Sequence, residues 1–128
     1  MKTQITQIAK IYNINMNIET VTGVEYDGIT EYENGVYNIK VNENANDETY
    51  THEFGHVIIN EINMNNPTAM NDIANVLMIG NDEVLADIIG NLVYQYEFGE
   101  TPRDMTYVFA NENDLNFVID TVVENMMN

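Results

Sequence analysis

Apolar residues recur along the first half of this chain with two periods, and each period predicts a different kind of element. Four residues near the N-terminus have the spacing of a short helix: Ile5, Ile8, Ala9 and Tyr12. The next three alternate with asparagine, as in a half-buried strand: Ile14, Met16 and Ile18. Asp27-Gly28 and Asn34-Gly35 are turn dipeptides, and the second separates two predicted strands, Ile29 to Glu33 and Val36 to Val41. We therefore expect a helix followed by about three antiparallel strands.

The remaining apolar positions have helical spacing. A helix is predicted from Asp47 to Ile62, and its core-facing stripe is Tyr50, Phe54, Val57, Ile58 and Ile62. After a break at Asn63 to Pro67, a short helix is expected to end at Gly80, and another begins at Asn81 or Asp82. A last helix carries an amphipathic stripe typical of core or dimer contacts: Leu115, Val118, Ile119, Val122, Val123 and Met126. Residues 1–128 are thus predicted to form one α+β domain.

Charge and composition narrow the functional classes. The chain contains 21 Asp and Glu residues but only 4 Lys and Arg residues, which gives a formal net charge of −17. Such a field repels nucleic acid and anionic membranes and favours encounter with a basic protein. The chain has no cysteine, which excludes thiolate metal ligands, and it has neither a secretory signal nor a run of membrane-spanning length. We expect a cytoplasmic protein, and the sequence leaves its oligomeric state open.

The strongest chemical signal is the H-E-x-x-H motif formed by His52, Glu53 and His56. The chain contains only two histidines, and both belong to this motif. Residues four apart lie on one face of a helix, so both imidazoles can bind one metal ion. The intervening glutamate is then placed to accept a proton from water rather than to bind the metal. The motif predicts a hydrolytic Zn²⁺ site, although manganese or iron could also occupy it.

Catalytic zinc generally has three protein ligands, so one ligand is missing from the motif. Without a third histidine or a cysteine, a carboxylate is the expected donor, and a tyrosine is the weaker alternative. Glu83 and Asp87 lie four apart on the next predicted helix, beside the small residues Ala86 and Gly90. We expect Glu83 to complete the coordination and Asp87 to accept the outward N–H of one ligating histidine. Three other acidic residues remain as alternatives: Glu61, Asp72 and Glu97.

Three segments resemble the ImmA/IrrE family of zinc metallopeptidases: Asn38 to Asn42, Thr51 to Ile59, and Glu83 to Asp87. The resemblance covers roughly Ile8 to Tyr96. It implies a helix, a small antiparallel sheet, the motif helix and a downstream helix with E-x-x-A-D. It also implies the site residues: His52, His56 and Glu83 as ligands, and Glu53 as the catalytic base. Family members commonly cleave helix-turn-helix repressors and are frequent on phages and mobile elements, so a basic DNA-binding protein is the implied substrate.

Several parts of this hypothesis stay open at the level of sequence. The candidate donors for the oxyanion are Tyr50, Tyr94, Tyr96 and Arg103, and the strand near Val36 to Val41 could hold an extended substrate. Residues Gly99 to Asn128 contain no recognised motif. The competing hypothesis is a non-catalytic acidic decoy that binds a nucleic-acid-binding host protein and keeps a structural or vestigial metal site. A third is a metal-stabilised interaction module without catalysis.

Overall fold

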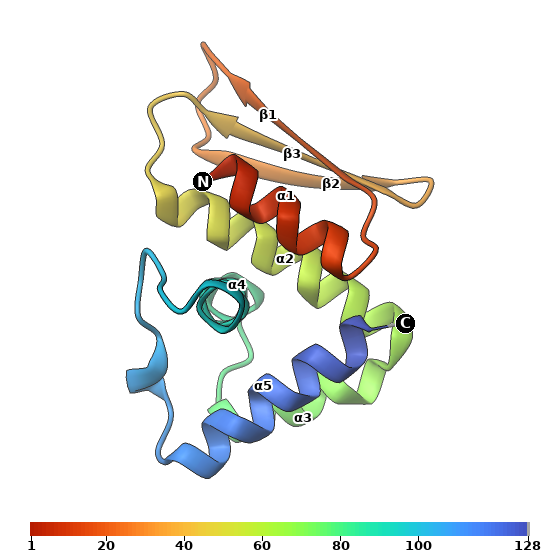
Figure 1. The fold of residues 1–128 in the computed structure, drawn as a ribbon, viewed down its shortest axis with the longest axis vertical. Helices are drawn as coiled ribbons and strands as arrows, with labels where there is room; N and C mark the ends of the chain where they lie inside the picture. The colour runs from red at the N-terminus through yellow and green to blue at the C-terminus, as the bar shows by residue number, and fades with distance from the viewer. Residues whose placement is uncertain (128) are drawn as a thin grey trace.

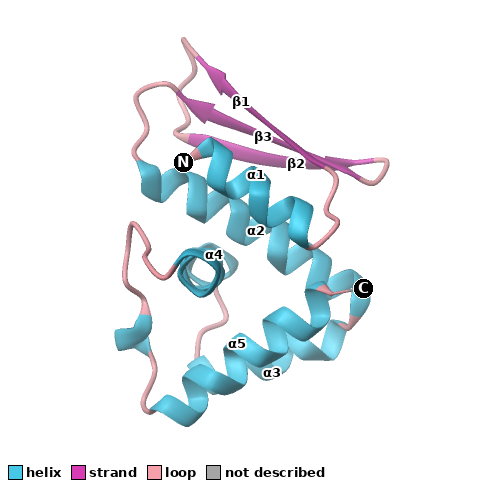
Figure 2. Ribbon diagram, viewed as in Figure 1, coloured by secondary structure: helices cyan, strands magenta, loops and turns pink. Residues whose placement is uncertain are grey.

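The computed structural model describes residues 1–127 and has the predicted α+β class (Figure 1). Its helices and strands follow one another in this order: α1 (Lys2–Ile11), β1 (Met16–Val21), β2 (Gly28–Glu33), β3 (Val36–Asn42), α2 (Asp47–Asn65), α3 (Pro67–Leu77), α4 (Asp82–Phe98), the 3-10 turn η1 (Thr106–Val108) and α5 (Glu112–Met126). α1 and α2 lie beneath the sheet, α4 packs on α2, and α3 and α5 lie at the end farthest from the sheet (Figure 2). None of the helices in the described range is long and apolar enough to cross a membrane.

The sheet is mixed, which corrects the expectation of a wholly antiparallel one. β2 and β3 form the predicted hairpin, with Asn34 and Gly35 both at positive φ (54° and 80°). The strand order is β1-β3-β2, and β1 pairs parallel to β3 so that Ile18 lies opposite Ile39. The chain therefore forms β1 at one edge of the sheet, then β2 at the opposite edge, and only then β3 between them. Alternating apolar residues identify strands, but they do not tell which strands become neighbours.

The boundaries of α2 and α3 also differ from the prediction. α2 continues to Asn65, three residues beyond the expected end, and only Asn66 separates it from α3. Asn66 is extended (φ −156°, ψ 90°) because the ring of Pro67 disfavours helical geometry in the preceding residue. α3 ends earlier than Gly80, because Met78 turns the chain at φ 57°.

Small residues let α2 and α4 pack backbone against backbone. A Cβ atom added to Gly55 would lie 2.0 Å from the carbonyl oxygen of Ala86, and one added to Gly90 would lie 1.9 Å from that of Thr51. Gly55 thus lies in close contact with the backbone of α4, where Ala86 is fully buried. This contact sets the distance between the motif helix and the helix that carries Glu83 and begins at the side-chain cap of Asn81.

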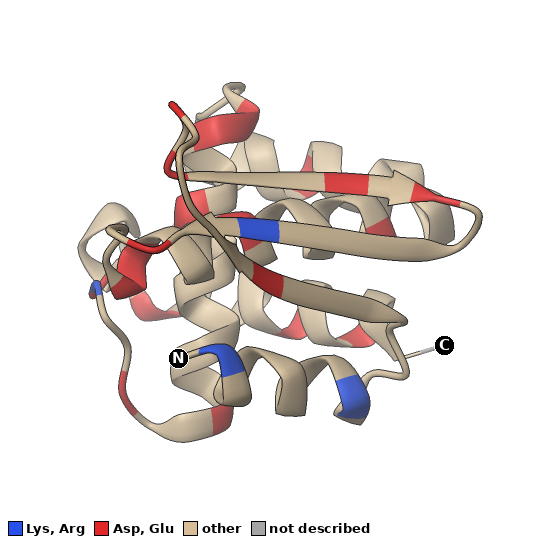
Figure 3. Ribbon diagram, turned by 90° about the horizontal axis from the view of Figure 1, so that it is seen from above, with Lys and Arg blue, Asp and Glu red and all other residues tan. Residues whose placement is uncertain are grey.

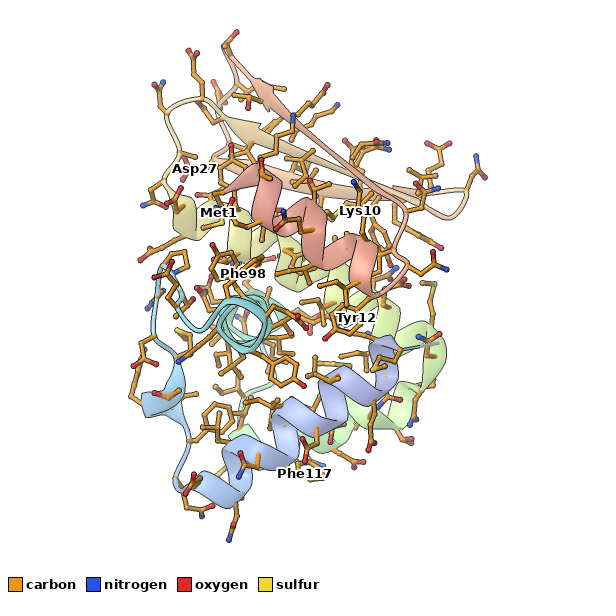
Figure 4. All side chains as sticks on the ribbon, viewed as in Figure 1. Met1, Lys10, Tyr12, Asp27, Phe98 and Phe117 are labelled. Atoms are coloured by element: carbon orange, nitrogen blue, oxygen red, sulfur yellow. The ribbon has the colours of Figure 1, made fainter. Side chains whose placement is uncertain are left out.

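The other helices close the core around this pair. Val118, Val122 and Met126 of α5 are buried and the helix packs on α2 and α3, so part of the predicted C-terminal stripe belongs to the core. Tyr12 lies at the end of α1 (Figure 4), and its hydroxyl donates a hydrogen bond to Glu97 Oε1 at 2.5 Å. This hydrogen bond links α1 to the C-terminal turn of α4, whereas Glu83 lies in the first turn of that helix.

Candidate metal centre

The structure places the two histidines of α2 and the glutamate of α4 at one point. His52 Nε2 and His56 Nε2 are 3.2 Å apart. The Glu83 carboxylate reaches both rings, with Oε2 2.9 Å from His52 Nε2 and Oε1 3.2 Å from His56 Nε2. One ligand atom from each of the three residues lies within 4.8 Å of the other two. The Glu83 carboxylate can reach both imidazoles because the close contact between Gly55 and Ala86 brings the first turn of α4 next to α2.

These separations fit a single tetrahedral zinc ion. With zinc–nitrogen distances of about 2.0–2.1 Å, two ligand atoms of a tetrahedral site lie about 3.3 Å apart. Two imidazoles and one carboxylate also form a donor set of catalytic zinc, which keeps a fourth position for water. Within residues 1–127, no other three His, Asp or Glu side chains converge in this way.

The alternative carboxylates lie elsewhere. Glu61 accepts a hydrogen bond from the Tyr37 hydroxyl at 3.2 Å, and Glu97 accepts the one from Tyr12. Asp72 is an exposed residue of α3. None of the three belongs to the group formed by the histidines and Glu83.

Asp87 lies behind His52, one turn along α4 from Glu83. Its Oδ1 is 2.6 Å from His52 Nδ1, so the carboxylate accepts the ring N–H and leaves Nε2 free to face a metal. Its other oxygen lies 3.7 Å from Nη1 of Arg103. The carboxylate therefore fixes both the orientation and the tautomer that His52 needs as a ligand.

Carboxylates dominate the electrostatics of the ligand group. Burial by itself lowers the pKa of His52, but the hydrogen bonds with Asp87 and Glu83 and the charges of Asp87 and Glu53 outweigh it, so the pKa is raised. For Glu83, partial burial opposes ionisation, yet the hydrogen bond with His52 and the neighbouring imidazoles lower the pKa of the carboxyl group. A proton and a metal ion therefore compete for the same place between these side chains.

Glu53 lies beside the ligand group without belonging to it. It is only 6% exposed, and its Oε2 is 3.9 Å from His52 Nε2. The hydroxyl of Thr30 in β2 lies 2.8 Å from Glu53 Oε1 and 3.1 Å from the Glu53 carbonyl oxygen. This hydrogen bond fixes Oε1 and leaves Oε2 on the side of the histidines.

Sequence reasoning missed two residues that support Glu53. The sequence pattern places Thr30 in a strand, and nothing local identifies its partner on α2. The dipeptide Asp27-Gly28 predicts a turn, whereas Gly28 begins β2, and a Cβ there would lie 2.8 Å from both Glu53 Cγ and Thr49 Cγ2. A glycine at the start of an otherwise regular strand was the available signal of close packing.

Two clefts flank this centre. The first has a volume of about 380 Å³ and is lined by Gly28, Ile29, Thr30, Tyr32, Tyr37, Glu53, His56, Asn60 and Glu83. The second has about 410 Å³ and is lined by Asp27, Gly28, Asn46, Glu48, Thr49, His52, Glu53, Glu83, Asp87 and Arg103. Gly28, Glu53 and Glu83 belong to both, so the two clefts meet over the centre, one on the His56 side and one on the His52 side.

The strand beside the clefts is β2, and this corrects the expectation that the strand near Val36 to Val41 holds a substrate. That segment is β3, which is paired on both sides. In the hairpin register, the peptide groups of Gly28, Thr30 and Tyr32 alternate with those bonded to β3, so their N–H and C=O groups face the free edge. This edge borders the first cleft.

The four candidate oxyanion donors lie in different environments. Arg103 borders the second cleft, next to Asp87. Tyr94 is buried and packs on Phe98 with ring centroids 4.9 Å apart, and this burial is the main cause of its raised pKa. Tyr96 is 56% exposed and borders a groove between α4 and α5, and Tyr50 is a half-buried residue of α2 that lines neither cleft. Arg103 alone among these candidates borders the centre.

No protein-family model, curated protein or solved structure matches this chain. The resemblance to the ImmA/IrrE family therefore stays a prediction that depends on the motifs themselves.

Proposed function

We propose that this chain is a zinc-dependent metallopeptidase of the ImmA/IrrE type. The observation that carries the proposal is the position of Glu53: a buried carboxylate with one oxygen fixed by Thr30 and the other 3.9 Å from a histidine of the three-donor group. A purely structural metal site has no use for an additional buried carboxylate beside its ligands. A hydrolytic site needs one, because the attacking water must lose a proton.

This geometry supports one role for each residue. His52, His56 and Glu83 would hold the metal, and Asp87 accepts the Nδ1–H of His52 and so orients its ring. A zinc ion bound there would supply a Lewis acid that makes water more acidic and polarises a carbonyl oxygen. Glu53 Oε2 accepts the proton of the attacking water and later returns it to the nitrogen of the leaving amine.

The edge of β2 gives an extended peptide a place to bind. The outward N–H and C=O groups of Gly28, Thr30 and Tyr32 can pair with the substrate backbone, as in other cases of strand addition. Thr30 belongs to this edge and also fixes Glu53, so the strand that orients the peptide also positions the base. The scissile bond would then lie where the two clefts meet.

The charge of the chain favours a basic protein as substrate, and a DNA-binding repressor is the class that the resemblance implies. Seen from above the sheet, acidic residues lie on β1 and β2, whereas β3 carries Lys40, the single basic residue of the strands (Figure 3). Lys40 is itself paired with Glu31 at 3.6 Å. This field speeds encounter with a cationic partner and disfavours nucleic acid.

The decisive experiment compares Glu53→Gln with the unchanged protein after zinc loading. We expect both to hold one zinc per chain, and we expect only the unchanged protein to cleave peptides in a mixed library read by mass spectrometry. Loss of a general base reduces turnover by about 10²–10⁴-fold. Glu112→Gln on the distant α5 is the matched control, and His56→Ala should lose the metal.

The acidic-decoy hypothesis makes the opposite prediction for the same variant. If Glu53→Gln retains full biological action against a host DNA-binding protein, cleavage is not the function. A metal that only raises the melting temperature, with no cleavage of any peptide, would instead indicate an interaction module.

A further inference from the structure

The first cleft continues past the metal centre to a group of side chains that has no role in the mechanism above. We propose that this end of the cleft, formed by Tyr32, Tyr37 and Asn60, binds an arginine side chain of the peptide substrate. The proposal depends on the proposed peptidase function, because it names a substrate feature that the same cleft selects.

Asn60 provides a hydrogen-bond acceptor for a cation. It follows His56 by four residues on α2, so it lies one turn farther along the face that bears the histidines. Its Nδ2 donates to the Tyr37 hydroxyl at 2.7 Å, and that hydroxyl donates to Glu61 Oε2 at 3.2 Å. A carboxylate only accepts hydrogen bonds, so this relay has one direction and fixes the amide orientation.

The fixed orientation leaves Asn60 Oδ1 as an acceptor. None of the hydrogen bonds within residues 1–127 uses this oxygen. In that range, Gln4 Oε1 is the one buried side-chain nitrogen or oxygen atom that lacks a hydrogen-bond partner. Asn60 Oδ1 also lacks a partner but is not among the buried atoms, so it is exposed to solvent. Because Asn60 lines the cleft, a donor entering the cleft can reach it.

Tyr32 provides an aromatic face in the same place. Its ring centroid is 4.5 Å from that of Tyr37, with the planes tilted by 42°, and this contact holds the ring at the edge of β2. Tyr32 is 45% exposed while Tyr37 is only 2% exposed, so Tyr32 is the ring available to a ligand. A guanidinium group stacks on such a ring and can donate to a neighbouring amide oxygen at the same time.

The charge around this end of the cleft also favours a cation. The lining includes Glu53 and Glu83 and no lysine or arginine. Glu61 lies directly behind Tyr37, and Lys40 belongs to the groove on the outer face of the sheet. A carboxylate side chain would meet only like charge here, and an aliphatic one would leave the Asn60 oxygen without a partner.

Three octapeptides test the proposal, identical except for a central arginine, citrulline or norleucine in an alanine background. Citrulline has the shape of arginine without its charge. Binding is measured by fluorescence anisotropy with zinc-loaded Glu53→Gln protein, and cleavage is measured with the unchanged zinc-loaded protein. We expect the arginine peptide to bind and to be cleaved at least about tenfold better than the citrulline peptide.

Two variants test whether Tyr32 and Asn60 cause the preference for the arginine peptide over the citrulline peptide. Asn60→Leu and Tyr32→Ala should each remove most of this preference. Asn38→Leu, on the outer face of β3, should leave the preference unchanged. Tyr32→Ala changes an exposed side chain, so it remains informative if Asn60→Leu lowers the melting temperature.

The outcomes separate this proposal from the peptidase hypothesis. Equal cleavage of the arginine and citrulline peptides overturns the arginine pocket and leaves the peptidase intact. Arginine-dependent binding that requires Tyr32 and Asn60, without cleavage by the unchanged protein, supports the pocket and overturns the peptidase. Equal or absent binding of all three peptides overturns the pocket.

Discussion

Replacing Gly55 by alanine tests whether the backbone contact between α2 and α4 sets the geometry of the metal centre. The new Cβ would lie 2.0 Å from the carbonyl oxygen of Ala86, and such contacts are not tolerated below 3.0 Å. The helices must therefore separate by about 1 Å (3.0 − 2.0). The neighbour is backbone rather than a mobile side chain, so rotation of a side chain cannot relieve the contact.

The expected cost follows from two opposing terms. Overpacking a core costs about 1–3 kcal/mol, with a backbone clash at the upper end, and alanine gains about 1 kcal/mol of helix propensity over glycine. We expect a net loss of about 2 kcal/mol, which lowers the melting temperature by about 6–10 °C. Glu83 moves with α4, and since ligand distances in zinc sites vary by only about 0.2 Å, zinc affinity should fall by at least about tenfold.

Thermal unfolding in chelator and zinc titration against a competing chelator measure the two effects separately. Gly80→Ala is the matched control, because a Cβ at Gly80 meets nothing within 4 Å. Gly90→Ala changes the same interface from the other helix and should resemble Gly55→Ala. If Gly55→Ala melts at or above the temperature of the unchanged protein and binds zinc equally well, the helix contact does not set the site.

Three further predictions concern the residues around the ligands. Thr30→Val removes the hydrogen bond to Glu53, so we expect about tenfold slower peptide cleavage at unchanged zinc content, and normal turnover would show that Thr30 does not position the base. Asp87→Asn should weaken zinc binding by about 10–100-fold in a chelator competition, and unaltered affinity would contradict its role in orienting His52. Zinc binding requires neutral His52, whose pKa is raised, so apparent affinity should fall by about tenfold per pH unit below that pKa, beginning at higher pH than for an ordinary histidine. A pH-independent affinity across the histidine range would refute this.

Local spacing along the chain is enough to predict several features of this protein. The positions of His52 and His56 on one helical face follow from the helical repeat, and the start of α4 follows from the side chain of Asn81, which caps it. The hairpin between β2 and β3 follows from Asn34-Gly35, which adopts positive φ readily. Glu83 and Asp87 could be proposed because a two-histidine motif lacks a ligand and these carboxylates have the right spacing on the next helix.

Which elements become neighbours depends on the three-dimensional packing of the whole chain. The parallel pairing of β1 made β2 the edge strand at the clefts, so the candidate substrate strand moved from β3 to β2. The same arrangement brought Thr30 to Glu53 across 23 positions of sequence, and the hairpin together with α2 brought Tyr37 to Asn60. Side-chain periodicity reports which face of an element is buried, but the partner on that face depends on how all elements share one core.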